Sequence, residues 1–230
     1  MKKILLPIIL VFCFSLGFSQ NMSIKKPNYN QIKKNISQNN STLFYPKLLE
    51  KFSNADTTMT LKEKRHLYYG FIYQKSYSPY TRSDYNDSLR ITLRKKKYET
   101  VDLKNIIKYS DSVLKHNPFN LNAINYKIYA DKQIKDSIGL IKDYTKMRII
   151  TDAMLSSGDG HSKETAYYVI SPTHEYSLIK LLGYEFGGKQ SLIDHFDYLT
   201  LKENEFLIEG LYFDVSASLN HMNSLFNKKE

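Results

Sequence analysis

The feature that most limits what this chain can fold into is a change of hydrophobic pattern around Gly158, Asp159 and Gly160. Before this point, apolar residues recur every three or four positions, which is the spacing of amphipathic helices. After it, the run AYYVI at 166–170 is rich in β-branched and aromatic residues, as strands are. The pattern predicts an α+β fold. We expect a single domain over 42–230, mainly helical over 42–157 and sheet-containing over 158–230.

The N-terminus has the parts of a secretory signal peptide, 1–19. Lys2 and Lys3 precede an apolar run at 4–16, and a small-x-small pattern ends at Ser19. The apolar run is shorter than the roughly 18 residues that a membrane-spanning helix needs. We therefore expect cleavage near Ser19, no transmembrane segment, and export to the periplasm, the cell surface or the extracellular space.

Cleavage would leave a mature chain without cysteine. The one cysteine, Cys13, lies inside the apolar run and not at the cleavage site, so a lipid anchor is not expected. Without a disulfide, an exported domain must be stabilised by its core alone. Residues 20–41 are polar and rich in asparagine. We expect a loosely attached leader there, with one short helix at 29–36.

Capping residues and apolar spacing predict the helices of the first half. Thr60 followed by Glu63 is a capping box, at the start of a helix that runs to about residue 73. Asn117 and Pro118 end one helix and Asn120 caps the next, which is weakly similar to a tetratricopeptide half-repeat, although no second copy follows. Other helices are expected at 43–52, 100–116 and 140–154, and 74–99 is expected to be an irregular loop.

The second half predicts a three-stranded antiparallel sheet with one helix crossing it. The strands are expected at 166–170, 196–201 and 206–215, with a hairpin turn at 203–205. Ser171 followed by Pro172 starts the crossing helix, which stops at Gly183. Gly187 and Gly188 indicate a turn, and a last short helix is expected at 217–226.

Several longer segments are distinctive in sequence and occur in a fixed order. They are FYPKLLEKF (44–52), LYYGFIYQ (67–74), SPY (78–80), SSGDGHSKETAYYVIS (156–171), EYSLIKLLG (175–183) and GLYFDVS (210–216). In these segments the chain resembles, from about residue 28 to 226, an uncharacterised family of exported Bacteroidota proteins known only as a domain of unknown function. The resemblance implies one contiguous exported domain, and it implies no activity, cofactor or partner.

The glycine-rich turn is the first candidate site. Asp159, His161 and Glu164 could bind a ligand or act as acid and base, because the neighbouring glycines allow close approach to the backbone. A turn in which Asp159 bonds nearby amides is the simpler interpretation. Tyrosines from the earlier helix and loop could add an aromatic platform for sugars or peptides, or could be core residues. The candidate platform residues are Tyr69, Tyr77 and Tyr80.

A second group of titratable residues is weaker. His195 and Asp197 would share one face of a strand, with Asp194 beside them. This could be an imidazole oriented by a carboxylate, but it is more simply the exposed end of a strand.

The sequence contains few signals for catalysis. The mature chain has no cysteine nucleophile, no serine lies in a G-x-S-x-G elbow, and the GDG turn leads into a strand and not into a helix. No metal site or cofactor is predicted. We expect a non-catalytic binding or structural module of the cell envelope. The alternative is a hydrolase that uses Asp159, His161 and Glu164, with or without a metal ion.

The net charge of +10 leaves the partner open. The densest positive cluster contains Arg90, Arg94, Lys95, Lys96 and Lys97, which could contact a polyanionic glycan or simply be solvated. An envelope protein is the other possible partner. No nucleic-acid-binding signature is present, so nucleic acid is not expected.

Overall fold

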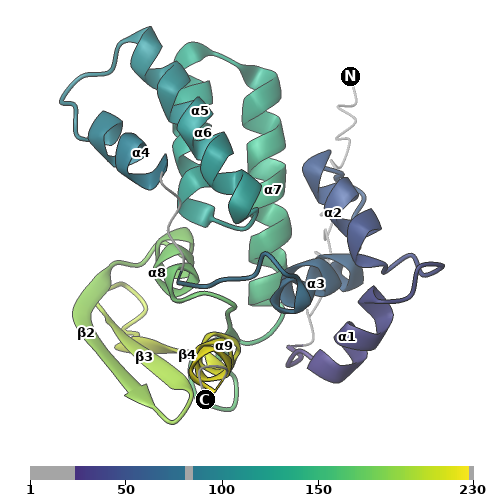
Figure 1. Cartoon of the computed structure of the whole chain (residues 1–230). Helices are drawn as coiled ribbons and strands as arrows, with labels where there is room; N and C mark the ends of the chain where they lie inside the picture. The colour runs from purple at the N-terminus through teal and green to yellow at the C-terminus, as the bar shows by residue number, and fades with distance from the viewer. Residues whose placement is uncertain (1–23, 81–84, 228–230) are drawn as a thin grey trace, which may run out of the picture.

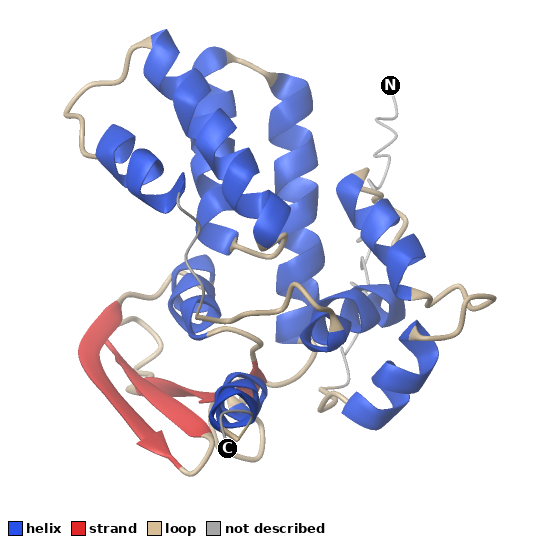
Figure 2. Cartoon of the chain, viewed as in Figure 1, coloured by secondary structure: helices blue, strands red, loops and turns tan. Residues whose placement is uncertain are grey.

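The computed structural model describes residues 24–80 and 85–227, so the predicted signal peptide lies outside the described residues. Within the described part, the sheet lies at one end of the molecule with the last two helices beside it and the other helices beyond, and the predicted α+β class is confirmed (Figures 1 and 2). No helix in the described part is long and apolar enough to cross a membrane.

Except for the helix at 85–93, which was not predicted, the helices of the first half begin and end close to the predicted positions. In chain order they are α1 (Tyr29–Ile36), α2 (Tyr45–Ser53), α3 (Leu61–Gly70) with the 3-10 turn η1 (Phe71–Tyr73), α4 (Tyr85–Leu93), α5 (Thr100–His116), α6 (Leu121–Ile134) and α7 (Ser137–Leu155). Asn120 caps α6 as predicted, because its side-chain oxygen accepts from the amide of Ala123 at 3.0 Å. Thr100 is the first residue of α5, and Glu99 and Asp102 form a capping box at this helix start.

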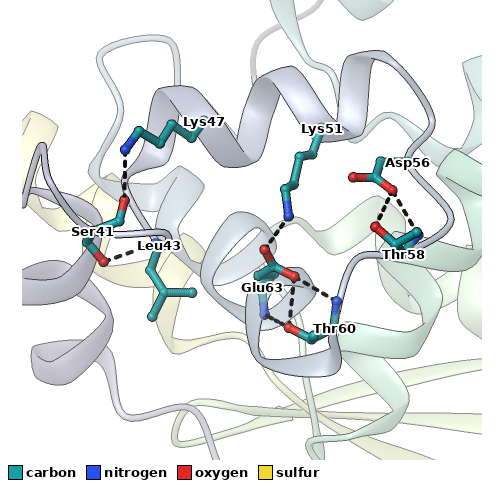
Figure 3. A network of polar contacts seen from close by, with 8 residues as sticks. All are labelled: Ser41, Leu43, Lys47, Lys51, Asp56, Thr58, Thr60 and Glu63. Carbon is teal, nitrogen blue, oxygen red and sulfur yellow. Dashed lines mark hydrogen bonds and ion pairs between the residues drawn. The ribbon is translucent and has the colours of Figure 1, made fainter.

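The predicted capping box at the start of α3 also joins α3 to α2. The Thr60 amide donates to Glu63 Oε2 at 2.8 Å, and the Glu63 amide donates to Thr60 Oγ1 at 3.3 Å. The other carboxylate oxygen of Glu63 accepts from Lys51 Nζ of α2 at 2.6 Å (Figure 3). One glutamate therefore caps its own helix and pairs with a neighbouring helix.

Helix α4 lies where the sequence pattern predicts an irregular loop. Its buried Leu89 packs in a small cluster with Leu103 and Ile106 of α5, and Leu93 covers the same cluster. Asn86 and the charged residues around it obscure the helical period of this segment. The helix is stabilised by packing against α5, which the local sequence does not indicate.

The N-terminal segment is attached more closely than its polar composition predicts. Ile32 and Ile36 of α1 lie in the main core. The Lys25 amide also donates to the carbonyl of Ser156, at the end of α7, at 3.0 Å. From Lys25 onward, this segment packs on α3 and α7.

The sheet has four strands and not three. They are β1 (Tyr167–Tyr168), β2 (Phe186–Ile193), β3 (Phe196–Leu201) and β4 (Gly210–Asp214), in the order β1-β4-β3-β2. The predicted antiparallel pair of β3 and β4 is confirmed. The prediction of a purely antiparallel sheet is wrong, because β1 pairs with β4 in parallel.

Strand β2 was not predicted from the sequence because it is a solvent-exposed edge strand. Only Phe186 is partly buried, so no alternation of apolar and polar residues marks it. Gly187 and Gly188, which indicate a turn in the sequence, instead lie at an irregularity in its pairing with β3, where Gly188 has a φ of +95°. The glycines bend the strand without ending it.

Helix α8 (Pro172–Leu181) lies between the helices α4–α7 and the sheet in Figure 1, and α9 (Ser216–Phe226) closes the chain beside β4. Both helices were predicted within one residue. The main core contains residues from both halves of the chain, including Tyr68, Phe119, Ile170 and Phe213.

A buried histidine connects three separate segments in this core. His174 of α8 bonds through Nε2 to the Phe119 carbonyl at 2.9 Å and through Nδ1 to the Tyr68 hydroxyl at 2.7 Å. A carbonyl can only accept, so Nε2 carries the hydrogen and Nδ1 accepts from Tyr68. The Tyr68 oxygen in turn accepts from the Ile170 amide at 3.3 Å. Burial lowers the pKa of His174 to about 4, so the ring is neutral at physiological pH.

Candidate functional site

The glycine-rich turn is a tight corner between α7 and β1. The amides of Asp159 and Gly160 both donate to the Thr165 carbonyl, at 2.9 and 2.8 Å. Asp159 Oδ1 accepts from Thr165 Oγ1 at 2.6 Å and from the His161 amide at 3.0 Å. Burial acts to raise the pKa of Asp159, but these bonds outweigh it and hold the pKa below its ordinary value. The Asp159 carboxylate thus bonds its own turn, as the simpler interpretation predicts.

The six predicted site residues lie in three different environments. His161 and Glu164 are exposed on the turn beside Asp159. Tyr69 and Tyr77 are buried in the core, where their hydroxyls donate to the carbonyls of Ala153 at 3.0 Å and Ile170 at 2.8 Å. Tyr80, by contrast, is 45% exposed. Among the residues described, no group of three or more His, Cys, Asp and Glu side chains is arranged to hold a metal ion.

Tyr80 lines a cleft of about 610 Å³ between α4, the facing ends of α5 and α6, and the start of α8, which we call the α4–α8 cleft. Its floor is apolar, with Leu89, Leu93 and Val113, and Tyr126 adds a second aromatic ring. The most strongly polar side chains lining it are two arginines and four asparagines: Arg90, Arg94, Asn86, Asn117, Asn120 and Asn122. None of the described lining residues is Asp or Glu.

The two arginines are exposed and largely available. Arg90 pairs with Asp87 on the same helix at 3.0 Å, but both side chains face solvent, so the pair contributes little free energy. Arg94 forms no ion pair with any residue that the structure describes. Planar guanidinium groups bind carboxylates and sulfates through paired hydrogen bonds, so the cleft can hold an anionic group.

The α4–α8 cleft was only partly visible in the sequence. Its arginines belong to the predicted positive cluster and Tyr80 to the predicted aromatic platform. The asparagines looked like caps, and Asn117 and Asn120 do use their carbonyl oxygens to cap the turn and α6. Only the packing of α4 against α5 brings these residues to one surface.

A buried pair of carboxyl groups lies near Tyr80. Glu175 of α8 is 0% exposed, and neither of its carboxyl oxygens receives a hydrogen bond from the described residues. Asp197 of β3 is 7% exposed and accepts from Gln190 Nε2 at 2.8 Å. Burial, followed by the negative charge of the nearby Asp197, raises the pKa of Glu175 to about 9. Glu175 is therefore protonated at neutral pH and can itself donate to Asp197.

The pairing of Asp197 differs from the predicted one. His195 precedes β3, and its Nε2 lies 3.4 Å from Asp214 Oδ2, whereas Asp197 faces Glu175. Asp197 lies on the same buried face of β3 as Leu199 and Leu201. The alternation of buried and partly exposed residues along β3 thus indicates that Asp197 is a buried acid. The charges of Glu175 and Asp197, after burial, raise the pKa of Tyr80, which places the pair close to the α4–α8 cleft.

Replacing Glu175 with glutamine is expected to stabilise the protein above pH 4.5. The folded-state pKa of about 9 exceeds the ordinary 4.5, so the wild type loses stability as the pH rises from 4.5 toward 9. Glutamine does not ionise, and it retains a donor toward Asp197. We expect E175Q to raise the free energy of unfolding at pH 8 by at least about 1.4 kcal/mol, the equivalent of one pKa unit. Urea unfolding at pH 5 and pH 8 measures the effect.

The exposed Glu164 provides the control for this measurement. E164Q should leave the free energy of unfolding nearly unchanged at either pH, because the side chain is exposed. A loss of stability in E175Q that grows with pH would contradict a protonated Glu175.

Comparison with known proteins adds one finding. A family model described as a domain of unknown function, DUF4919, matches residues 30–224, which includes the glycine-rich turn, the α4–α8 cleft and the carboxyl pair. No curated protein and no solved structure matches the chain.

Proposed function

The chain belongs to the DUF4919 family of domains of unknown function, and from that premise we propose that it is an exported, non-catalytic binding module of the cell envelope. Its binding site is the α4–α8 cleft, and its ligand is an anionic, hydroxyl-rich molecule such as an acidic glycan.

The charge of the cleft is the observation on which this proposal rests. Arg90 and Arg94 line the cleft together with its apolar residues, and no described lining residue carries a carboxylate. The pair that Arg90 forms with Asp87 is solvent-exposed and contributes little free energy. Asparagine amides can both donate to and accept from sugar hydroxyls. The exposed ring of Tyr80 gives the apolar face that sugar rings stack on.

Export is proposed from the N-terminal sequence. The two lysines, the apolar run at 4–16 and the small residues that end at Ser19 are the parts of a cleavable signal. A mature chain without cysteine is compatible with an oxidising compartment, because it has no thiol to protect.

The hydrolase alternative receives less support. Asp159 Oδ1 is already occupied by two donors of its own turn, and its pKa is low, which is unfavourable for a general acid at neutral pH. We therefore place the ligand at the cleft and give the turn a structural role.

Binding to heparin, a sulfated and uronate-bearing glycan, tests the proposal. The cleft variant R90E/R94E should weaken binding by about tenfold or more, because it removes two guanidinium contacts. The matched control K96E/K97E changes the net charge equally on exposed residues outside the cleft lining. We expect it to weaken binding by less than about threefold. Titration at two salt concentrations measures both constants.

Equal losses in the two variants would show that heparin binds the diffuse positive surface and not the cleft. Circular dichroism of each variant, compared with the wild type, verifies that both remain folded.

A further inference from the structure

The loop 202–209 between β3 and β4 exposes two large apolar side chains. Phe206 is 72% exposed and Leu207 is 84% exposed. Leu207 also has a φ of +55°, a left-handed conformation that costs a leucine roughly 1–2 kcal/mol. Neither the exposure nor the conformation helps this molecule to fold, and such combinations often mark an interaction surface.

The loop is held in one shape by its own hydrogen bonds. Asn204 Nδ2 donates to the carbonyls of Lys202 at 3.0 Å and Ile208 at 2.8 Å, and Asn204 Oδ1 accepts from the Ile208 amide at 3.2 Å. The Phe206 ring packs edge-on against Tyr184, with ring centres 6.3 Å apart. The two apolar side chains are thus presented on an ordered support, which lowers the entropic cost of binding.

The loop 202–209 that carries the two apolar side chains is acidic, with three glutamates and one lysine, although the whole chain carries a net charge of +10. Lys189 of β2 lines the same hollow as Leu207. Glu203, Glu205 and Glu209 are exposed and form no ion pair with the described residues, whereas Lys202 is paired with Glu185 at 2.6 Å. The α4–α8 cleft has the complementary properties: an apolar floor, two arginines at its rim, and no acid among its described lining residues.

We propose that the loop 202–209 of one molecule inserts into the α4–α8 cleft of a second copy of this chain. Phe206 and Leu207 contact the apolar floor, and the three glutamates face Arg90 and Arg94. This inference rests on the proposed function, since it assigns a partner to the same cleft. An anionic glycan then competes with the loop, so ligand binding separates the copies.

The geometry of this contact determines the kind of assembly. Each molecule offers one loop and one cleft, so a single contact leaves one loop and one cleft of the pair unoccupied. Such contacts can continue into open chains, close into rings, or be made reciprocally in a two-fold dimer. The negative charge beside Phe206 and Leu207 disfavours the other apolar partner, an anionic membrane surface.

Sedimentation velocity of the mature protein from about 10 μM to 1 mM tests the assembly, because a small interface of this kind gives micromolar or weaker affinity. We expect the average mass to rise with concentration and to fall on addition of salt or heparin. The loop variant F206S/L207N and the cleft variant R90E/R94E should each remain monomeric. Asparagine tolerates the left-handed conformation, so the loop variant is expected to fold.

Mixing the two variants gives the sharpest result. The loop variant retains an intact cleft and the cleft variant retains an intact loop, so together they can form one contact. We expect dimers of one copy of each variant and no larger species. The control I138S/I141S removes two apolar side chains of similar exposure, 68% and 64%, on α7, and it should assemble as the wild type does.

Three results would overturn the inference: a wild type that is monomeric over the whole range, a mixture that stays monomeric, or equal weakening by I138S/I141S. Binding of vesicles containing anionic lipid, lost in F206S/L207N without any self-association, would assign the loop to a membrane instead. Heparin binding that F206S/L207N leaves unchanged, with no assembly by the wild type, would refute this inference alone and leave the proposed function standing.

Discussion

Replacing Gly158 with alanine is expected to destabilise the protein by about 3 kcal/mol or more, the largest effect of any alanine substitution considered. A methyl group at this position would lie 2.2 Å from the Thr165 carbonyl oxygen and 2.3 Å from that of Ala166. Both atoms belong to the backbone. The Thr165 oxygen also accepts from the amides of Asp159 and Gly160, so it cannot move without breaking the corner. Urea unfolding followed by circular dichroism measures the loss.

Gly183 is the matched control. It has a φ of +84°, but a methyl group there would meet nothing within 4 Å. G183A should therefore cost only the left-handed strain of roughly 1 kcal/mol. Equal losses of stability in G158A and G183A would contradict the explanation that close backbone packing requires glycine at position 158.

Replacing His174 with leucine is expected to cost about 2–5 kcal/mol at pH 7.5, because the Tyr68 hydroxyl and the Phe119 carbonyl each lose a partner in the core. Leucine fills a similar volume, so the loss reports hydrogen bonding more than packing. Equilibrium unfolding at several pH values measures it.

The pH dependence separates the histidine from a general packing effect. Its folded-state pKa of about 4 is below the ordinary 6.5, so the wild type is fully stabilised above pH 6.5 and loses stability as the pH falls toward 4. That loss amounts to about 3 kcal/mol over the window. In H174L this contribution is absent, so the difference between variant and wild type should shrink as the pH falls. A difference that is constant from pH 7.5 to 4.5 would contradict a buried neutral imidazole.

Two tyrosines provide a control for the network itself. Y68F removes a hydroxyl that bonds both His174 and Ile170, and it should cost about 1–3 kcal/mol. Y45F removes a buried hydroxyl that has no hydrogen-bond partner among the residues the structure describes, and it should be neutral or stabilising.

Much of the secondary structure followed from local chemistry. Each of three helix starts is marked by residues that lie within a few positions of it, so its place could be predicted. These signals are Thr60 with Glu63, Asn120, and Ser171 before Pro172. The edge strand β2 and helix α4 could not, since their identity depends on pairing with β3 and packing against α5.

The candidate site was harder to predict, because its parts are distant in sequence. Pro79 and Ser171, which both line the α4–α8 cleft, are 92 positions apart, and no local pattern relates them. Glu175 lies in the first turn of α8, where an exposed negative charge is favourable, so no local feature indicates that it is buried. The face of β3 that holds Asp197 with Leu199 was the one readable sign of a buried acid.

The parallel pairing of β1 with β4 has a consequence for the order in which the molecule is completed. Between these two strands the chain forms α8, β2 and β3, and β4 is the last strand among the described residues. Gly160 also accepts from the Tyr212 amide, so the corner after α7 obtains its final partner from β4 as well. Helices with local contacts can pack early, whereas the corner is protected from proteases only once β4 has docked.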